Sequence, residues 1–148
     1  MCRGWRRKPR AARGACRQAL QSVALSRTIT DTMDDCIFCK IARGLIPSKK
    51  VYEDSEIFAF QDIHPQAPVH FMLIPKKHIA SLGEAGAEDA GVLGRMLALS
   101  GKLAREQGSP DGYRTIINTG RIGRQDVMHL HIHVLGGSEP LGRMLPRD

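Results

Sequence analysis

Residues 129–135 read His-Leu-His-Ile-His-Val-Leu, a strict alternation of histidine with branched apolar residues. A period of two is typical of a strand that is buried on one side, because successive side chains point to opposite faces. The pattern predicts a strand whose core face carries Leu130, Ile132 and Val134. Its other face carries His129, His131 and His133, about 6.6 Å apart from one to the next. One short stretch thus supplies a packing face and a candidate functional face.

The sequence around this strand predicts a small α+β domain. Segments with strand or helix periodicity alternate with turn residues. The expected elements are a short helix over 37–42, a hairpin formed by 51–53 and 57–60 around Asp54-Ser55, a loop marked by Pro65 and Pro68, a buried strand over 70–74 ended by Pro75, a long helix over 84–107 with Gly108 as its C-cap glycine, and a strand over 113–118. This order favours an antiparallel sheet with helices packed on it.

The long helix depends on one apolar stripe for its burial. We expect this stripe to face the sheet, because residues three or four apart share one side of a helix. The stripe consists of Ala90, Leu93, Leu97 and Ala104, backed by Met96 and Leu103.

The charges of the chain are divided unevenly. Residues 1–32 hold eight of the 22 Lys and Arg residues and one acid, which accounts for the whole formal charge of +7. Residues 33–148 are formally neutral, so the charge argument for nucleic-acid binding does not apply to the domain. The chain has 148 residues and no apolar run near the roughly 18 residues of a membrane span, which indicates one domain and no membrane partner.

Three interpretations of the Arg-rich residues 1–32 stay open: an extension upstream of a start at Met33, a mitochondrial transit peptide, or a basic arm that touches nucleic acid. We predict that these residues are disordered and that the domain spans 33–148. The four cysteines lie at positions 2, 16, 36 and 39 and cannot cross-link distant elements. We therefore expect a reducing, cytoplasmic location, and a mitochondrial one only if residues 1–32 are a transit peptide.

Two kinds of chemistry suit three histidines on one strand face. Histidines two apart can hold a metal ion, and a neutral imidazole can attack phosphorus or an acyl carbon. Three imidazoles spread over about 13 Å cannot all reach one ion, whose bonds to nitrogen are about 2.0–2.1 Å long. At least one of the histidines therefore has another role.

The pattern His-φ-His-φ-His-φ-φ, in which φ is apolar, resembles the signature of the histidine triad family of nucleotide hydrolases and transferases. Other segments resemble the Hint branch of that family, and the last of them its bacterial nucleotide-binding members. These segments are Cys-Ile-Phe-Cys-Lys-Ile at 36–41, Asp-Ile-His-Pro-Gln-Ala-Pro-Val-His-Phe at 62–71, Ile-Pro-Lys-Lys-His-Ile at 74–79, His-Val-Leu-Gly-Gly at 133–137 and Pro-Leu-Gly-Arg-Met-Leu at 140–145. The resemblance implies an antiparallel five-stranded sheet with one long and one short helix, and a homodimer through which the sheet continues.

The resemblance also implies hydrolysis of nucleoside 5′-phosphoramidates at the α-phosphorus, on purine nucleotides such as AMP or GMP, through a nucleotidyl-histidine intermediate. His131 matches the nucleophile and His133 the residue near the phosphate and leaving group. His70 matches the upstream histidine that orients the nucleophile, and His129 is the first histidine of the triad. Catalysis of this kind needs no metal, because the histidine itself supplies the nucleophile.

The same resemblance assigns a nucleotide site. Asp62 matches the acid that accepts hydrogen bonds from the ribose hydroxyls, and Asn118, Gln125 and Asp126 lie at phosphate-side positions. The walls of the base pocket match Ile37, Phe38, Ile41, Ile46, Phe60 and Ile63, residue types that suit a flat base. Each residue also has a plain structural interpretation, with the apolar ones in the core, Asp62 in a turn and His70 as a buried core histidine.

Three residues depart from the family pattern. Arg124 stands where relatives usually keep a glycine, Asp126 where eukaryotic members often have serine, and Met128 in place of the usual tyrosine. A carboxylate near a phosphate is unfavourable unless it faces away or holds a neighbour. These departures leave the leaving-group preference open.

A metal site is also implied. Cys36, Cys39, His78 and His129 match the structural zinc ligands of some triad proteins, and a Cys₂His₂ set suits tetrahedral zinc. The alternative is a pair of reduced cysteines at a helix start with a surface histidine nearby.

Other functions compete with phosphoramidate hydrolysis. One is a dinucleoside polyphosphate hydrolase, a sister branch, and another is a nucleotide sensor or scaffold with little turnover. A nucleotidyltransferase is disfavoured because that branch typically lacks the third histidine, which is present here as His133. A nucleic-acid binder is disfavoured by the neutral domain.

Overall fold

The computed structural model describes residues 35–145, so the predictions made for residues 1–32 lie outside the described range. Its elements, in chain order, are α2 (Ile37–Ala42), β1 (Lys50–Glu53), β2 (Ile57–Gln61), β3 (Val69–Pro75), the 3-10 turns η1 (Leu82–Glu84) and η2 (Ala87–Asp89), α3 (Ala90–Glu106), β4 (Tyr113–Ile116) and β5 (Ile132–Gly136). The predicted α+β class, with a five-stranded sheet, one long helix and one short helix, is confirmed.

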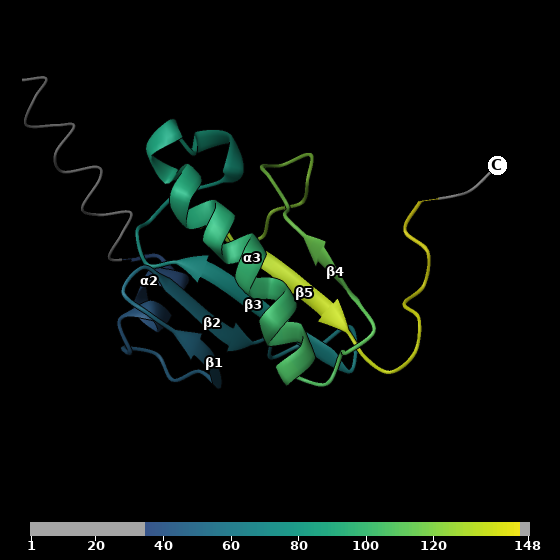
Figure 1. Ribbon diagram of the computed structural model, residues 1–148. Coiled ribbons are helices and arrows are strands. Elements are labelled where there is room, and N and C mark those ends of the chain that lie inside the picture. The colour runs from purple at the N-terminus through teal and green to yellow at the C-terminus, as the bar shows by residue number, and fades with distance from the viewer. Residues whose placement is uncertain (1–34, 146–148) are drawn as a thin grey trace, which may run out of the picture. The chain divides into compact units, whose positions relative to one another are not determined.

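The five strands form one sheet in the order β1-β2-β3-β5-β4, and every neighbouring pair is antiparallel. Figure 1 shows α3 lying across one face of this sheet and β4 at its edge. The strand expected over 113–118 is shorter than predicted, and among residues 35–145 it pairs with β5 alone.

Strand alternation sends two sets of side chains to the two faces of the sheet, and both sets are buried. The set beneath α3 comprises Ile57, Ala59, Val69, Phe71, Leu73, Leu130, Ile132 and Val134, which pack with Met96, Leu103 and Ala104. The set on the other face comprises Phe58, Phe60, Met72 and Ile74, which pack with Phe38 and Ile41 of α2. The predicted core face of residues 129–135 is confirmed. Since α2 is short, the second face keeps room for the histidines.

The last strand starts later than the sequence predicts. β5 begins at Ile132, so His129 and His131 precede it. The backbone there is bonded elsewhere: the N–H of Leu130 donates to the carbonyl of Ile79 at 2.6 Å, and the N–H of His129 to that of Val127 at 2.8 Å. These bonds replace the strand ladder, but the side chains still alternate between the core and the opposite face.

The long helix also starts later, at Ala90 rather than near residue 84. The backbone at Gly86 is extended, and its N–H donates to the buried carboxylate of Asp89 at 3.1 Å. A side chain that takes up this N–H competes with helical pairing, so the helix begins only after Asp89. Its buried stripe is rotated from the expected one, because Leu97 is 47% exposed and Ala90 is exposed, while Ser100 is buried.

The helix ends as the sequence predicts. Gly108 has a φ of 102°, its N–H donates to the carbonyl of Arg105, and the N–H of Ser109 donates to that of Ala104 at 2.9 Å. These two bonds form the Schellman motif that a C-cap glycine allows. Separately, no helix within residues 35–145 has the length and apolar character that crossing a bilayer requires.

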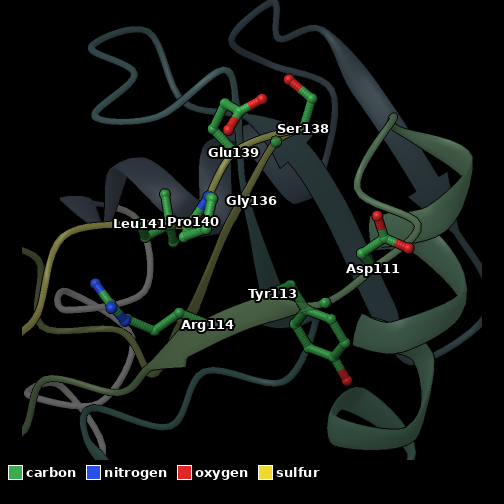
Figure 2. Close-up of a pocket in the computed structure, with 10 residues that line it drawn as sticks. Asp111, Tyr113, Arg114, Gly136, Ser138, Glu139, Pro140 and Leu141 are labelled. Carbon is green, nitrogen blue, oxygen red and sulfur yellow. The ribbon is translucent and has the colours of Figure 1, made fainter.

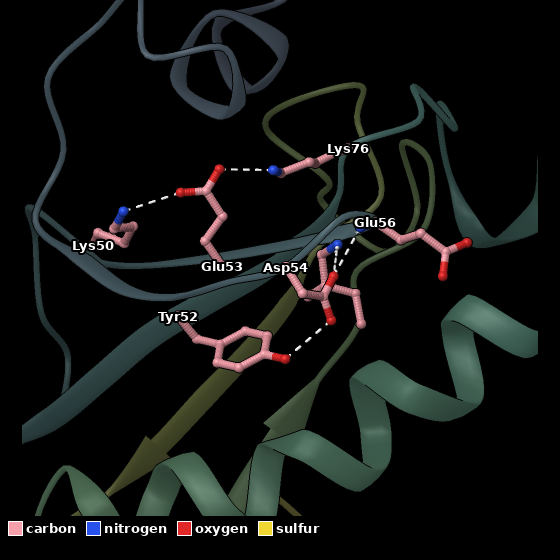
Figure 3. Close-up of polar contacts among 7 residues, drawn as sticks. Lys50, Tyr52, Glu53, Asp54, Glu56 and Lys76 are labelled. Carbon is pink, nitrogen blue, oxygen red and sulfur yellow. Dashed lines mark hydrogen bonds and ion pairs between the residues drawn. The ribbon is translucent and has the colours of Figure 1, made fainter.

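Polar contacts fix the hairpin of β1 and β2 (Figure 3). The Asp54 carboxylate accepts the N–H groups of Glu56 and Ile57, each at 2.8 Å, which closes the turn. The Tyr52 hydroxyl donates to the same carboxylate at 3.0 Å. Arg95 of α3 pairs with Asp54 and Glu56, so the hairpin is tied to the long helix.

Candidate functional site

Three of the predicted site residues meet on the sheet face that α3 does not cover. The N–H of Asp62 donates to the carbonyl of His70 on β3 at 3.1 Å, and Met72 of β3 pairs with His133 of β5. Opposite residues of an antiparallel pair share a face. His70 Nε2 therefore lies 3.0 Å from His133 Nδ1 and 3.3 Å from Asp62 Oδ2.

His131 lies just before β5 and is only 4% exposed. Its Nδ1 is 2.7 Å from the carbonyl oxygen of His129. Because a carbonyl only accepts, Nδ1 carries the proton and Nε2 keeps a lone pair. The ring is held edge-to-face by Phe38 and His133, with centroid distances of 5.3 and 4.9 Å. A fixed ring with one bare nitrogen is suited to nucleophilic attack.

Burial keeps the neighbouring histidines neutral. Burial, together with the charges of His131 and His70, lowers the pKa of His133 to about 4, against the opposing effect of the carboxylates of Asp62 and Asp126. Burial also lowers the pKa of His70, again opposed by Asp62. Neutral imidazoles can each donate and accept one hydrogen bond at neutral pH.

We expect the free energy of unfolding to fall when the pH is lowered from 7 to 5. His133 has a pKa of about 4 in the folded chain against 6.5 for the free side chain, so between these values the unfolded state binds more protons. The contribution of His133 is complete above about pH 6.5, and about 2 kcal/mol of it is lost by pH 5. Urea denaturation of metal-free protein at the two pH values measures this loss.

Two variants separate His133 from the other histidines. His133→Asn should reduce the dependence of the unfolding free energy on pH by about this amount, and His64→Ala, at an exposed loop position, is the matched control. Equal pH dependence in both variants would show that His133 does not carry the effect.

The residues of the predicted base pocket fall into two groups. Phe38, Ile41 and Phe60 are buried, and the rings of Phe38 and Phe60 meet edge-on at 5.5 Å. Ile46 is partly buried against the same cluster. Ile37 and Ile63 are 46% and 86% exposed and offer apolar surface to a ligand. The burial of Phe38, Ile41 and Phe60 agrees with the alternative interpretation of these residues as part of the core. Contact of the six residues with a base stays a prediction.

Asn118 and Asp126 both lie in the segment that joins β4 to β5. Asn118 is half-buried and lies two residues beyond Ile116, which pairs with His133. A phosphate-side contact by Asn118 stays a prediction. Asp126 is exposed, and its charge raises the pKa of His133, so the carboxylate acts on the triad.

Gln125 makes hydrogen bonds within the protein that the sequence analysis did not predict. Its Oε1 accepts the N–H of Gly120 at 2.9 Å, and its Nε2 donates to the carbonyls of Ala80 and Val127 at 2.7 and 2.9 Å. Both amide hydrogens are thus used within the protein. Gln125 fixes the loop before the triad, and a phosphate contact by it stays a prediction.

Arg124, next to Gln125, has a φ of 54°, and no other non-glycine residue within 35–145 has a positive φ. We expect Arg124→Gly to raise the free energy of unfolding by about 0.5–1 kcal/mol. A Cβ costs about 1–2 kcal/mol in this conformation, and the greater freedom of unfolded glycine offsets part of the gain. Chemical denaturation measures the change. The matched control is Arg121→Gly, in the same exposed turn without a positive φ, which should lose about 0.5–1 kcal/mol. Equal changes in both variants would contradict the backbone argument.

Cys36, Cys39, His78 and His129 form a second cluster, and their potential ligand atoms all lie within 4.8 Å of one another. The two cysteines flank the start of α2, His78 follows β3, and His129 precedes β5. Cys39 Sγ lies 3.3 Å from His78 Nδ1 and 3.5 Å from His129 Nδ1, and the two Nδ1 atoms are 3.2 Å apart. Cys36 Sγ lies 3.4 Å from His129 Nδ1.

These donors fit a tetrahedral zinc ion. Zinc–ligand bonds of about 2.05 and 2.3 Å put two nitrogens about 3.4 Å apart and a nitrogen and sulfur about 3.6 Å apart. His129 Nε2 donates to the carbonyl of Pro75 at 2.8 Å, so its Nδ1 lone pair faces the cluster, as second contacts of ligand histidines usually ensure. Burial and the neighbouring Cys36 raise the pKa of the Cys39 thiol to about 11, a shift that a bound cation reverses.

Phe38 connects this cluster with the triad. It lies on α2 between the two cysteines, and its ring meets those of His129 and His131 edge-on, at 6.0 and 5.3 Å. The carbonyl of His129 also holds the His131 ring. Loss of the cluster would therefore disturb both the aromatic wall and the nucleophile candidate.

A pocket of about 460 Å³ lies elsewhere, between the start of β4 and the segment that follows β5 (Figure 2). Asp111, Tyr113, Arg114 and Glu139 are among its lining residues. None of the predicted site residues lines this pocket, which borders the edge strand instead.

Residues 35–144 match the family model described as "Scavenger mRNA decapping enzyme C-term binding". The structure resembles a histidine triad protein from Clostridium difficile with a TM-score of 0.69 and 44% identity, over 74% of this chain and 96% of that one. The chain belongs to the histidine triad family. A HIT family hydrolase from Clostridium thermocellum, with a TM-score of 0.71 and 41% identity over 75% of this chain and 97% of that one, has the same histidine triad fold.

Curated histidine triad relatives are similar over nearly their full length. Protein HitA of Neisseria gonorrhoeae is 51% identical over 104 residues, which are 70% of this chain and 97% of the relative. Purine nucleoside phosphoramidase of Escherichia coli K12 is 48% identical over 113 residues, which are 76% of this chain and 94% of the relative. With the family established, this chain is a histidine triad hydrolase.

One group of the triad site was missed by the sequence analysis. The backbone N–H of Gln66 donates to Nδ1 of His70 at 3.1 Å. Every residue except proline has a backbone N–H, so the residue type at position 66 did not indicate this contact. The only signal was the loop itself, which Pro65 and Pro68 stiffen just before His70.

Proposed function

We propose that this chain hydrolyses purine nucleoside 5′-phosphoramidates to the nucleoside monophosphate and an amine. The observation that carries the proposal is the state of His131, whose Nδ1–H is held by a carbonyl while its Nε2 stays bare beside His133. The activity named for the 48% identical relative of Escherichia coli supports this substrate class.

The reaction proceeds in two displacements at the α-phosphorus. His131 Nε2 attacks phosphorus and the P–N bond breaks, while the leaving nitrogen takes up a proton from solvent and departs as an amine. His133 donates a hydrogen bond to that nitrogen. Water then attacks the nucleotidyl-His131 intermediate, releases the monophosphate and restores the free ring, and its proton returns to solvent.

The neighbouring residues bind the nucleotide. The Asp62 carboxylate accepts hydrogen bonds from the ribose hydroxyls, since a vicinal diol offers two donors to one acceptor group. The exposed Ile37 and Ile63 flank the base, and the rings of Phe38 and Phe60 support them from the core.

The test is release of AMP from adenosine 5′-phosphoramidate by the full chain, with acid quenching to trap labelled nucleotide on the protein. We expect steady turnover and a trapped adduct on His131. Tight AMP binding without turnover would overturn the proposal in favour of a nucleotide sensor. Faster cleavage of a dinucleoside polyphosphate would favour the sister hydrolase branch.

We further propose that Cys36, Cys39, His78 and His129 hold a structural zinc ion. Two thiolates and two imidazoles at tetrahedral spacing support this proposal. The ion would supply a cross-link between α2, the segment after β3 and the segment before β5. No catalytic step depends on it, because His131 supplies the nucleophile.

We also propose that two chains form a homodimer along β4. Within the described part of the chain this strand pairs only with β5, and an open strand edge offers N–H and carbonyl groups to a second copy. Exposed Tyr113 and Leu97 supply apolar surface near that edge. Sedimentation of the full chain should give twice 16.3 kDa, and a monomer at micromolar concentration would contradict the dimer.

A further inference from the structure

We infer that the backbone amide of Gln66 sets the proton positions of the site, because it fixes the tautomer of His70 and, through His70, that of His133. Gln66 thereby acts as a positioning residue. The kinetic part of this inference rests on the proposed phosphoramidate hydrolysis, whereas the tautomers themselves are independent of any activity.

The first step is the bond from Gln66 to His70. A backbone N–H can only donate, and it lies 3.1 Å from His70 Nδ1. This nitrogen therefore keeps its lone pair, and the proton of the neutral ring is on Nε2. The Nε2–H then faces His133 Nδ1 at 3.0 Å and Asp62 Oδ2 at 3.3 Å, both of which can accept it.

The hydrogen bond from His70 then fixes the position of the proton on His133. The Nδ1 of His133 accepts the hydrogen bond from His70 Nε2. It lies 3.9 Å from Asp62 Oδ2, which is too far for Nδ1 to donate a hydrogen bond to that carboxylate. The proton of neutral His133 is therefore on Nε2. No residue within 35–145 accepts a hydrogen bond from that nitrogen, and the side chain is 20% exposed, so the Nε2–H is available to substrate.

The result is a complementary pair of imidazoles. His131 presents a bare Nε2 and His133 presents an Nε2–H, and the two rings lie edge-to-face at 4.9 Å. One can attack phosphorus while the other donates to the leaving nitrogen. With the opposite tautomer, His133 would turn a lone pair toward the leaving nitrogen, and the two lone pairs would repel.

Local hydrogen bonds and two prolines fix the backbone of the loop that carries Gln66. Asp62 Oδ1 accepts the N–H of His64 at 2.8 Å, and the Gln66 side chain donates to the carbonyl of His64 at 2.9 Å. Pro65 and Pro68 restrict the backbone on both sides. The N–H of Gln66 is thus aimed at His70 by local bonds that do not involve the triad.

The same constraint distinguishes two clusters that both look suited to a metal. Asp62, His70 and His133 also bring ligand atoms within 4.8 Å of one another. A ligand histidine normally donates with its other nitrogen, as His129 does to the Pro75 carbonyl. His70 accepts there instead, so its Nε2 carries a proton and is not a ligand. Only the cysteine-containing cluster has the tautomer that a metal needs.

The direct test is nitrogen NMR of the full chain labelled in its histidines, which distinguishes N–H from bare ring nitrogens. Near neutral pH we expect the Nε2–H form for His70 and His133 and the Nδ1–H form for His131. The Nδ1–H form of His70 in the folded protein would overturn the inference, whether or not the chain hydrolyses phosphoramidates.

Two substitutions at position 66 test the effect on turnover. Gln66→Pro removes the N–H, and we expect kcat to fall about tenfold with KM within about twofold, and mixed tautomers at His70 and His133. Gln66→Ala keeps the N–H and is the matched control; it loses the side-chain bond to the His64 carbonyl, so we expect a smaller fall in kcat, of less than about threefold. Equal loss in both variants would show that the side chain, and not the amide, matters.

Substitutions of His70 keep the test decisive if Gln66→Pro does not fold. His70→Gln places an amide donor near the original Nε2 but cannot exchange a proton, whereas His70→Ala has no donor. We expect His70→Gln to retain at least about ten times the kcat of His70→Ala. Equal inactivity of the two, with AMP binding intact, would mean that His70 moves protons during turnover and would overturn the positioning role.

Discussion

Replacement of His131 by asparagine should lower kcat for phosphoramidate hydrolysis by about four orders of magnitude, a typical effect of losing a catalytic nucleophile. Asparagine can still donate to the carbonyl of His129, as His131 Nδ1 does at 2.7 Å. It has no bare nitrogen to attack phosphorus. The substitution therefore removes the chemistry and keeps the hydrogen bond that places the side chain.

Turnover and nucleotide binding separate this role from a structural one. AMP affinity, measured calorimetrically, should change by less than about threefold, because the base and ribose contacts lie elsewhere. His64→Ala is the matched control, since His64 is exposed and its hydrogen bonds within residues 35–145 are made by its backbone. If His131→Asn retained more than about a tenth of the wild-type kcat with the fold intact, the nucleophile would have to be another group.

Much of the fold was predictable from local patterns. The alternation in 129–135 gave the core face correctly because strand geometry alone decides it. The end of α3 was predictable because Gly108 has few alternatives to a C-cap. The starts of α3 and β5 were not, because each is set by a specific contact: the Asp89 carboxylate takes the Gly86 N–H, and Leu130 is bonded to Ile79.

The site was predictable to the extent that side chains carry it. The Cys36–Cys39–His78–His129 set converges as the family resemblance implied. The resemblance assigned His70 to orienting His131, whereas its ring lies 3.0 Å from His133, so a direct effect of His70 on His131 stays a prediction. What residue types could not show is the part played by the backbone. The carbonyl of His129 and the amide of Gln66 decide which imidazole nitrogens are protonated. Any residue at position 129, and any residue except proline at position 66, would supply the same group.

Metal removal should have the second large effect, on stability. If free zinc stands at about a thousand times its dissociation constant, binding to the native state contributes about 4 kcal/mol. For a domain of this size that loss corresponds to a fall in Tm of about 15 °C. Thermal unfolding with zinc and with a chelator should show it, and elemental analysis should find one zinc ion per chain.

Cysteine variants attribute this effect to the cluster. Cys39→Ser removes a buried ligand and should abolish the zinc-dependent part of Tm. Cys16→Ser, outside the predicted domain, should preserve it and serves as the control. An equal response to chelator in both variants, or absence of zinc from metal-replete protein, would refute the site.

Metal removal should also affect the nucleotide site, because the Phe38 ring contacts both His129 and His131. Without the ion, α2 loses its link to His78 and His129, and the aromatic wall beside His131 loosens. We therefore expect AMP to bind about threefold to tenfold more weakly to metal-free protein, and zinc to bind more tightly by the same factor when AMP is present, because the coupling is reciprocal.

The chelated protein, held below its lowered Tm, should still turn over at saturating substrate, since His131 needs no metal to attack. Complete loss of turnover in chelated protein that remains folded would place the ion in the chemistry and contradict a purely structural site.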